Sequence, residues 1–522
     1  WHAERAQSMI FVGDAYGMIG QPEQQAASYS RAFYHDSSRR EALIKLARFF
    51  QHNNNALAAN AYATAALEIG WQPFYANNRA HYEHEPHEIL YWAKGWLGDI
   101  TGAQHHVLEG LKWRPYNKKI LADTKYYFEY FDRGIDGWMR FPELTWLYNM
   151  SKQVTSVAEI GSWKGRSTHA LLSGGAQVTA IDHFIGSADE RDGTHGIETF
   201  EAFKENTKGF KNLEIKKMSS AEASVGDEKY DMVFIDAGHT YEEVKDDIQR
   251  WLPKTRFVIS GHDYAPEWPG VVKAVNESFG KPDGVADSVW YKFIGPKVSF
   301  VLPTLGRPEG LQKCLDSISR LRYPHELIET IVIEDVPRLG VPKRVKEGVE
   351  KSTGDYIVYA ANDIEFDPNS LAIALRETKS LIAFNTGVGL MPDDGYRCEH
   401  FVIKRSFIDK IGGEIFDTEF DHVGVDALLW YKASKLGEAV LAEDAIVHHH
   451  HFSRPGGSMD EVNKIGWAKA DEDRGRLQQK LQPIPKRIFS IWLNDDPIVP
   501  GLISKTLSTH TLEGFEHQLI TL

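Results

Sequence analysis

The chain is short of cysteine, of positive charge and of long apolar runs, and each shortage excludes a class of protein. Its 522 residues include only two cysteines, Cys314 and Cys398, which lie far apart. This excludes a disulfide framework and favours a reducing compartment. No run reaches the roughly 18 apolar residues of a membrane span, and the first residues lack a signal-peptide pattern. We therefore expect a cytoplasmic protein without a membrane span.

Acidic residues outnumber basic ones. Lys and Arg total 59 against 73 Asp and Glu, which gives a net charge of −14. Nucleic acids and anionic membranes require a basic surface, so we expect no nucleic-acid partner. A bound nucleotide is still compatible with this charge, because metal ions and backbone amides can hold its phosphates.

The length and the ordinary composition predict a modular globular chain. Hydrophobic residues make up 42% and charged residues 25%, as in folded domains, and 522 residues correspond to three or four domains. The chain begins with Trp1 in a helical pattern and ends inside the apolar run 518–522. We therefore expect a segment of a longer protein.

The first quarter has the pattern of a helical repeat. Tyr29 and Ala32 recur 33 residues later as Tyr62 and Ala65, close to the tetratricopeptide period of about 34 residues. Small residues at helical spacing let paired helices pack closely. Residues 1–130 resemble tetratricopeptide repeats, which implies a spacer or a surface for self-association, or alternatively a site for peptide or glycan capture.

Strands and helices alternate from about residue 138. Residues 157–168 predict a strand, a glycine-containing turn and a helix. Gly161 and Gly165 would let the backbone approach a bound cofactor, and the helix N-terminus would add a favourable dipole. Trp163 stands in the turn where the dinucleotide fingerprint has its middle glycine. This argues against NAD.

Three later strands also end in polar residues. Strand 178–182 ends in Asp182, and an acid there can accept hydrogen bonds from both ribose hydroxyls of a nucleoside. Strand 230–235 leads to Asp236 and His239, and strand 256–261 leads to His262 and Asp263. Open α/β sheets bind their ligands at these strand ends.

Together these motifs resemble the class I methyltransferases that use S-adenosylmethionine. The resemblance spans about residues 150–295 and implies cofactor contacts and a metal site. His262 stands where metal-dependent relatives often have another acid, which puts the metal in doubt. His239 is the candidate general base, because imidazole titrates near neutral pH. The implied cofactor residues are Glu159, Gly161, Gly165 and Asp182, and the implied metal ligands, for Mn²⁺ or Mg²⁺, are Asp236 and Asp263.

A third set of buried strands with polar ends follows Gly295-Pro296. Strand 298–304 ends in Pro303-Thr304, strand 331–333 leads to Asp335, and strand 355–359 leads to Asp363 and Glu365. A pyrophosphate donor needs charge neutralisation, which carboxylate-held Mg²⁺ or Mn²⁺ supplies. Because alternate residues of a strand share a face, we expect Asp363 and Glu365 to face one metal site.

This pattern resembles the inverting family 2 glycosyltransferases with the GT-A fold, over about residues 297–452. The resemblance implies that Pro303, Thr304, Asp335 and Asp363 bind the nucleotide sugar, that Asp363 holds the metal, and that Asp426 is the general base. A UDP-sugar is favoured by family frequency. Two departures raise the chance of a weak or inactive transferase: Ala361 replaces the first Asp of the motif, and Val425 replaces the Glu before the base.

Four histidines at 448–451 follow the strand 445–447. Alternation would place His448 and His450 on one side of the chain, and the family often has a histidine there, near the donor phosphates. Histidine can coordinate Mn²⁺-like ions when oxygen ligands complete the site. We therefore expect His448 to join Asp363 and Glu365 as a metal ligand.

The sequence thus predicts a multidomain chain: a tetratricopeptide-like α-helical repeat (1–130), then two α/β domains. These are a Rossmann-like methyltransferase (138–295) and a GT-A sugar transferase (297–482). Residues 483–522 resemble the start of another sugar-transferase domain and have no catalytic role alone. The predicted function is glycan building, by sugar transfer to a hydroxyl acceptor and methyl transfer to a hydroxyl. Two alternatives stay open: a glycan-binding scaffold with vestigial transferase domains, and a methyltransferase that acts on an unrelated protein or small molecule.

Overall fold

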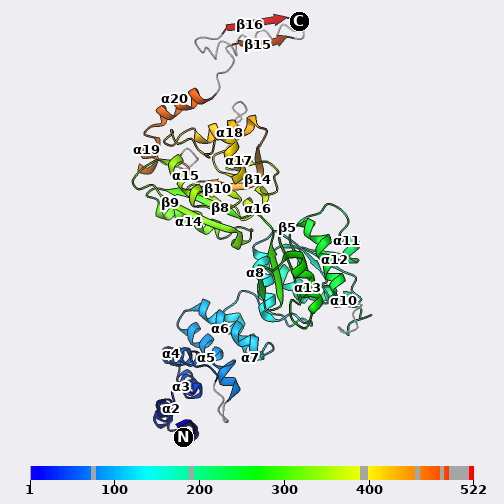
Figure 1. Ribbon diagram of the computed structural model, residues 1–522, viewed down its shortest axis with the longest axis vertical. Helices are drawn as coiled ribbons and strands as arrows, with labels where there is room; N and C mark the ends of the chain where they lie inside the picture. Colours follow the sequence, from blue (N-terminus) through cyan, green and yellow to red (C-terminus); the bar gives the residue numbers. More distant parts are fainter. Residues whose placement is uncertain are drawn as a thin grey trace. The chain divides into compact units, whose positions relative to one another are not determined.

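The computed structural model describes residues 2–71, 78–186, 193–387, 398–452 and 459–481. It also describes the backbone of β15 (Arg487–Trp492) and β16 (Glu516–Thr521), which pair in parallel. The chain divides into two compact units, residues 1–295 with 322–324 and residues 296–321 with 325–522 (Figure 1). The predicted fold class, a helical repeat followed by two α/β domains, is confirmed.

The N-terminal part of the first unit is helical throughout. Helix α1 packs against α2, α3 against α4, and α5 against α6. None of the helices in the described ranges is long and apolar enough to cross a bilayer. The helices are α1 (His2–Met18), α2 (Pro22–His35), α3 (Arg40–His52), α4 (Ala56–Leu67), α5 (Glu85–Trp96), α6 (Ile100–Trp113) and α7 (Lys118–Asp123).

Small residues and side-chain caps account for these helical pairs. Tyr29 and Ala32 of α2 are buried, and a Cβ on Gly13 of α1 would lie 2.5 Å from the Tyr29 ring, so glycine allows the close approach. Asn55 and Asp99 cap α4 and α6 by accepting hydrogen bonds from backbone N–H groups. Such caps satisfy donors that the first helical turn leaves unpaired.

The second part of this unit is a seven-stranded sheet with the order β3-β2-β1-β4-β5-β7-β6. Strands β1 to β5 are parallel, and β7 is antiparallel to β5. The strand order reverses beside β1, and ligands bind at such switch points. The strands are β1 (Ser156–Ile160), β2 (Gln177–Asp182), β3 (Leu213–Lys217), β4 (Tyr230–Ile235), β5 (Thr255–Gly261), β6 (Gly284–Ala286) and β7 (Val289–Phe293).

Helices cover this sheet. Every residue of β4 is buried, as expected for a parallel strand covered on both faces. Helix α8 packs against α9, and α12 packs against α13. The helices are α8 (Phe141–Lys152), α9 (Arg166–Gly174), α10 (Phe200–Thr207), α11 (Ser220–Ala223), α12 (Tyr241–Trp251) and α13 (Pro269–Phe279).

The second unit contains a mixed seven-stranded sheet with the order β11-β14-β12-β13-β10-β8-β9. Strands β8, β9 and β10 are parallel, and β13 is antiparallel to β10. The carboxyl ends of the three parallel strands therefore share one edge. The strands are β8 (Val298–Thr304), β9 (Ile328–Glu334), β10 (Tyr356–Tyr359), β11 (Ile364–Phe366), β12 (Leu381–Asn385), β13 (Phe401–Lys404) and β14 (Ala439–His449).

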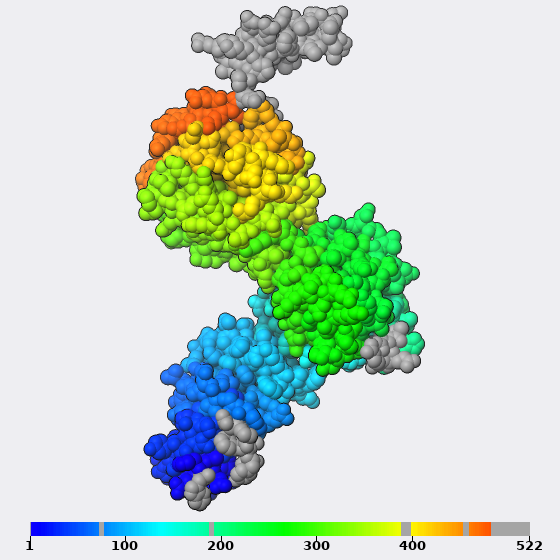
Figure 2. Space-filling model, viewed as in Figure 1, coloured from blue at the N-terminus to red at the C-terminus, as the bar shows by residue number. Residues whose placement is uncertain are grey.

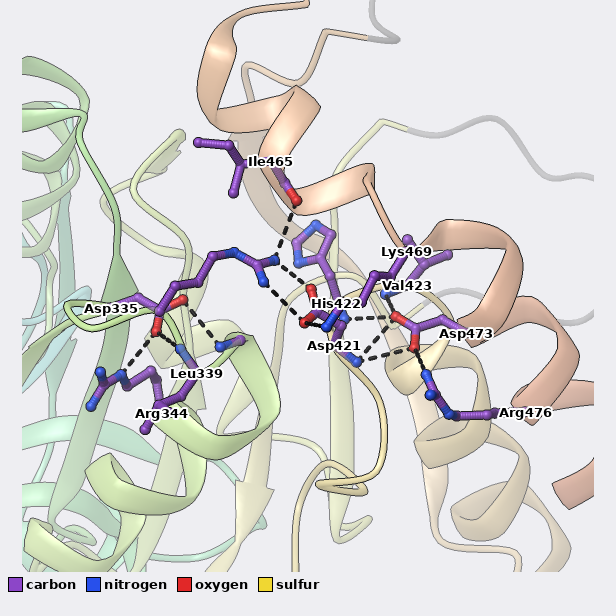
Figure 3. A network of polar contacts seen from close by, with 12 residues as sticks. Asp335, Leu339, Arg344, Asp421, His422, Val423, Ile465, Lys469, Asp473 and Arg476 are labelled. Carbon is purple, nitrogen blue, oxygen red and sulfur yellow. Dashed lines mark hydrogen bonds and ion pairs between the residues drawn. The ribbon is translucent and has the colours of Figure 1, made fainter.

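The last two helices of this unit are held to the α/β domain by a buried carboxylate. Asp473 is fully buried and accepts backbone N–H hydrogen bonds from Asp421, His422 and Val423 at 2.8 to 3.1 Å (Figure 3). The orange residues of both helices lie on the surface of this domain (Figure 2). The helices of the unit are α14 (Pro308–Ile318), α15 (Val341–Lys351), α16 (Ser370–Ala374), α17 (Arg405–Ile408), α18 (Val425–Lys435), α19 (Glu461–Trp467) and α20 (Ala470–Lys480).

We predict that Asp473→Ala destabilises this domain by about 3 kcal/mol, because three backbone donors lose their acceptor. The matched control is Asp471→Ala, since the Asp471 side chain is 97% exposed. Substitutions at exposed positions usually change the free energy of unfolding by no more than about 0.5 kcal/mol. Scanning calorimetry and hydrogen exchange at amides 421–423 check this. Equal melting and equal exchange in both variants would contradict it.

Candidate functional sites

A cavity of about 380 Å³ lies at the carboxyl ends of β1, β2, β4 and β5. This volume is in the range of small-molecule sites. The cavity brings together five of the residues predicted for the methyltransferase site. These are Gly161, Asp182, Asp236, His239 and Asp263.

The turn after β1 is shaped by Gly161 and Asp182. Gly161 has φ +87°, and a Cβ there would lie 2.0 Å from the carbonyl oxygen of Asp236, so only glycine fits. Asp182 Oδ2 accepts the N–H groups of Ser162 and Trp163, both at 2.8 Å. The end of β2 thereby holds the turn open beside the cavity.

Glu159 and Gly165 do not line the cavity. Glu159 is fully buried beneath the turn and accepts hydrogen bonds from Ser162 Oγ at 2.8 Å and Thr168 Oγ1 at 2.5 Å. Burial raises the pKa of Glu159 to about 7, against the lowering effect of these hydroxyls. A Cβ on Gly165 would meet Thr207 and Phe203 of α10. Both residues therefore shape the turn from outside the cavity.

Two histidines and two aspartates meet at the ends of β4 and β5. His239 Nε2 lies 3.0 Å from Asp263 Oδ2. His262 Nδ1 lies 3.2 Å from the same oxygen and 3.4 Å from Asp236 Oδ1. On its other side, His262 Nε2 lies 3.3 Å from the buried Glu143 Oε1. The four side chains around His262 thus form a continuous polar chain from the core to the cavity.

These contacts set the charges of the group. Burial alone would lower the pKa of His262, but Asp236, Asp263 and Glu143 raise it well above its usual range. Burial would raise the pKa of Asp263, but His239 and His262 hold it well below its usual range. In this arrangement the imidazole of His262 is the cation among the carboxylates.

The same group offers ligand atoms for a metal ion. Donor atoms of Asp236, His262 and Asp263 lie within 4.8 Å of one another. A metal ion binds a neutral imidazole, whereas these carboxylates favour the protonated form. A bound ion and the protonated His262 therefore exclude each other.

Sequence reasoning missed the aromatic walls of this cavity. Trp268 lies over His239, with ring centroids 4.4 Å apart, and Trp138 lies 5.6 Å from Trp163. All three tryptophans line the cavity. Trp268 follows Asp263 by five residues, in the loop beyond β5. This position in the sequence could have indicated that it lines the cavity.

A second cavity, of about 460 Å³, lies at the carboxyl ends of β8, β9 and β10. It brings together the nucleotide-sugar residues and the base implied by the glycosyltransferase resemblance. These are Pro303, Thr304, Asp335, Asp363 and Asp426.

Asp363 is flanked by two cations. Its Oδ2 lies 3.1 Å from Arg307 Nη1, and its Oδ1 lies 3.6 Å from His449 Nε2. Burial alone would raise the pKa of Asp363, but His449 and Arg307 hold it well below its usual range. Burial alone would also lower the pKa of His449, but Asp363 and Glu399 raise it to about 9. His449 is therefore protonated at neutral pH.

Glu365 and His448 lie outside this cavity, contrary to the expected common metal site. Glu365 pairs with His448 across β11 and β14, and Glu365 Oε1 lies 3.0 Å from His450 Nε2. The reason is that Asp363 lies in a turn before β11 begins, so strand alternation does not extend to it. The histidine that faces Asp363 is consequently His449.

Asp335 is engaged within its own turn. Its Oδ1 accepts hydrogen bonds from Leu339 N–H at 2.6 Å and Arg344 Nε at 3.0 Å, and its Oδ2 accepts one from Gly340 N–H at 3.2 Å (Figure 3). Thr304 Oγ1 accepts a hydrogen bond from Asn362 Nδ2 at 2.9 Å. Asp335 thus holds its own turn, whereas Thr304 joins the ends of β8 and β10 at the cavity wall.

Asp426 lies in the first turn of α18. Burial raises its pKa to about 6, although the N–H of Ala427 opposes the shift. A carboxylate with a pKa near the working pH is suited to accept a proton. The chemistry of Asp426 therefore matches a general base.

His400 is a further residue that the sequence did not single out. It is 2% exposed, stacks on Tyr359 with centroids 5.5 Å apart, and lies edge-on to His449 at 4.7 Å. Burial lowers the pKa of His400 to about 3. It is therefore neutral beside the charged His449.

Comparison with known proteins gives a match to the part of the chain around the first cavity. The model of a methyltransferase domain family matches residues 158–264, which include β4, β5 and the end of β1. No curated protein sequence matches the chain. Residues 158–264 are thus similar to a methyltransferase domain.

Solved structures show weaker likenesses. The first TPR domain of human RPAP3 is 14% identical over 24% of this chain and 89% of that one, with a TM-score of 0.21. S. aureus TarS in complex with UDP is 11% identical over 29% and 59%, with a TM-score of 0.25. The mannosyltransferase PcManGT from Pyrobaculum calidifontis, in complex with GDP-Man and Mn²⁺, is 15% identical over 41% and 81%, also with a TM-score of 0.25. Such low scores decide neither a fold nor an activity.

We predict that Gly161→Ala destabilises the domain that contains the first cavity by about 3 kcal/mol or more. The added Cβ would meet the Asp236 carbonyl in addition to the strain of a positive φ. Gly226→Ala is the control, because Gly226 also has positive φ but open space around an added Cβ, and should cost only about 1–2 kcal/mol. Thermal unfolding measures both, and equal losses would refute the packing constraint.

Proposed function

We propose that residues 138–295 form a class I O-methyltransferase that uses S-adenosylmethionine, and that residues 297–482 form an inverting GT-A sugar transferase. The observation that carries the first activity is the cavity shared by the Gly161 turn and the His239–Asp263 pair. Residues 1–130 are proposed as a surface for self-association or protein contact. The proposed compartment is the cytoplasm.

The residues at the first cavity fit the cofactor. Gly161 lets the turn approach the carbonyl of Asp236 beside the cavity, and Asp182 stands at the end of β2, where a ribose is held in open α/β sheets. S-adenosylmethionine supplies an electrophilic methyl group when bound. A cationic sulfonium also suits a cavity whose wall carries Asp236 and Asp263.

His239 would move the proton of the acceptor hydroxyl. Its Nε2 lies 3.0 Å from Asp263 Oδ2, and an imidazole beside a carboxylate can take up a proton from a hydroxyl. Asp263 orients the ring and stabilises the imidazolium that forms. Proton removal makes the acceptor oxygen a stronger nucleophile toward the methyl group.

The second activity rests on Asp363 and Asp426 lining one cavity with Thr304. Asp426 would deprotonate the acceptor hydroxyl as the nucleotide diphosphate leaves. A UDP-sugar is the favoured donor, and a glycan hydroxyl the favoured acceptor. We infer that both domains modify one glycan, because a single chain carries them.

A divalent ion fits the second cavity poorly. Ala361 supplies no carboxylate, Glu365 faces away, and the oxygens of Asp363 already contact Arg307 and His449. Among the described residues, no group of three close metal-ligating side chains lies at this cavity. The residues at this cavity therefore do not fit Mn²⁺ or Mg²⁺.

The joint proposal is tested with labelled S-adenosylmethionine and a panel of nucleotide sugars. The expected result is label in the same glycan that receives the sugar. Label only in protein or small molecules would overturn the shared-glycan inference. Calorimetry with UDP and with S-adenosylhomocysteine tests the scaffold alternative. Absence of binding of both ligands at millimolar concentration would favour the scaffold.

We predict that His239→Ala lowers the rate of methyl transfer by about 10²- to 10⁴-fold, the range for loss of a general base. The affinity for S-adenosylhomocysteine should be unchanged, because His239 acts on the acceptor. His195→Ala, at an exposed histidine, is the control and should keep full activity. An undiminished rate in His239→Ala would exclude the assigned base.

We predict that Asp426→Asn lowers sugar transfer at least about 100-fold and retains UDP binding. In the unsubstituted chain, kcat/KM should fall as pH drops below about 6, because Asp426 accepts a proton only when ionised and its pKa is raised to about 6. Stopped assays from pH 5 to pH 8 measure this. A profile that is flat down to pH 5 would argue against Asp426 as the base.

A further inference from the structure

The second cavity contains an ion-pair network that the proposed chemistry leaves unused. Arg307 contacts two carboxylates at once. Its Nη1 lies 3.1 Å from Asp363 Oδ2, and its Nε and Nη2 each lie 2.8 Å from one oxygen of Asp460. The guanidinium therefore bridges the floor of the cavity and the start of α19.

Asp460 belongs to a segment that forms one wall of the cavity. It caps α19 by accepting the N–H of Asn463 at 2.7 Å. Val462, Asn463 and Trp467 of the same helix line the cavity. The position of Arg307 is thus coupled to the position of this wall.

The far end of the segment is held independently of Arg307. Arg338 forms a two-pronged ion pair with Asp421, and its Nη2 donates a hydrogen bond to the carbonyl oxygen of Ile465 at 3.3 Å (Figure 3). Asp473 anchors α20 on the backbone of residues 421–423. Loss of the Arg307–Asp460 pair would therefore free the start of α19 without detaching the segment.

The chemistry of the leaving group requires positive charge here. Of the carboxylates expected to hold an ion, Asp363 is the one that lines the cavity. A guanidinium is always charged and its planar fork matches phosphate oxygens with two hydrogen bonds. In this structure the guanidinium of Arg307 donates its paired hydrogen bonds to the carboxylate of Asp460. The Asp460 side chain is 46% exposed and the Arg307 side chain is 18% exposed. A phosphate and Asp460 would compete for one set of donors.

We propose that Arg307 binds the diphosphate of the sugar donor and that Asp460 is an internal competitor which holds Arg307 until the donor arrives. Donor binding then exchanges the Arg307–Asp460 pair for an Arg307–phosphate pair and releases the start of α19. The inference rests on the proposed sugar transfer. It assigns the charge neutralisation of the leaving group to this chain's own guanidinium.

The test is calorimetry of the full chain with UDP and with uridine, in EDTA and in Mn²⁺. Arg307→Gln should weaken UDP binding by about tenfold to a hundredfold, the range for hydrogen bonds to charged groups, and leave uridine binding unchanged. Asp460→Asn should tighten UDP binding about twofold to fivefold, since a competing ion pair of this exposure is worth little more. Asparagine caps a helix as well as aspartate, so α19 stays formed.

Glu461→Gln is the matched control, because Glu461 starts the same helix but is 81% exposed and pairs with Lys464. It should leave the affinity for UDP unchanged. Equal UDP affinity in Asp460→Asn and the unsubstituted chain would overturn the competition. Equal weakening of UDP and uridine in Arg307→Gln would show a structural role instead. Failure of the unsubstituted chain to bind UDP, GDP or dTDP would overturn the proposed sugar transfer as well.

Discussion

Buried carboxylates that need a matching positive or polar partner organise both cavities. A charge removed from water is costly unless it is paired and hydrogen-bonded. Asp263 is matched by His239 and His262, and Asp363 is matched by Arg307 and His449. At each cavity a cation therefore lies beside the acid at a strand end.

The two cavities differ in the kind of cation that they use. The first relies on imidazoles, which can release or accept a proton and so suit proton transfer to and from an acceptor hydroxyl. The second adds a guanidinium, which cannot lose its charge and so suits a diphosphate. The first cavity thus pairs its acids with imidazoles, whereas the second pairs Asp363 with both an imidazole and a guanidinium.

Much of the first site was predictable because strand ends are visible in the sequence. Parallel strands expose their carboxyl ends at one edge, and Asp182, His239 and Asp263 each follow an apolar run. The structure places all three at one cavity. The same reasoning misjudged Glu159, because an acid inside a buried strand end points beneath the turn.

The second site shows where the sequence was insufficient. Residue spacing placed Thr304 and Asp363 at neighbouring strand ends, as the cavity shows. Spacing misjudged Glu365 and His448, because the turn before β11 interrupts the alternation that the spacing assumes. A difference of one residue in where a strand begins decides which histidine faces Asp363.

Local periodicity in the sequence predicted a helical part followed by two sets of strands with acids at their ends, and the structure has this order. Only the tertiary structure decided the partners of those acids. Arg307 and Asp460 are far apart in sequence yet form a two-pronged ion pair, and His262 reaches Glu143 across the core. Such pairs depend on how the elements pack, and no local pattern encodes that packing.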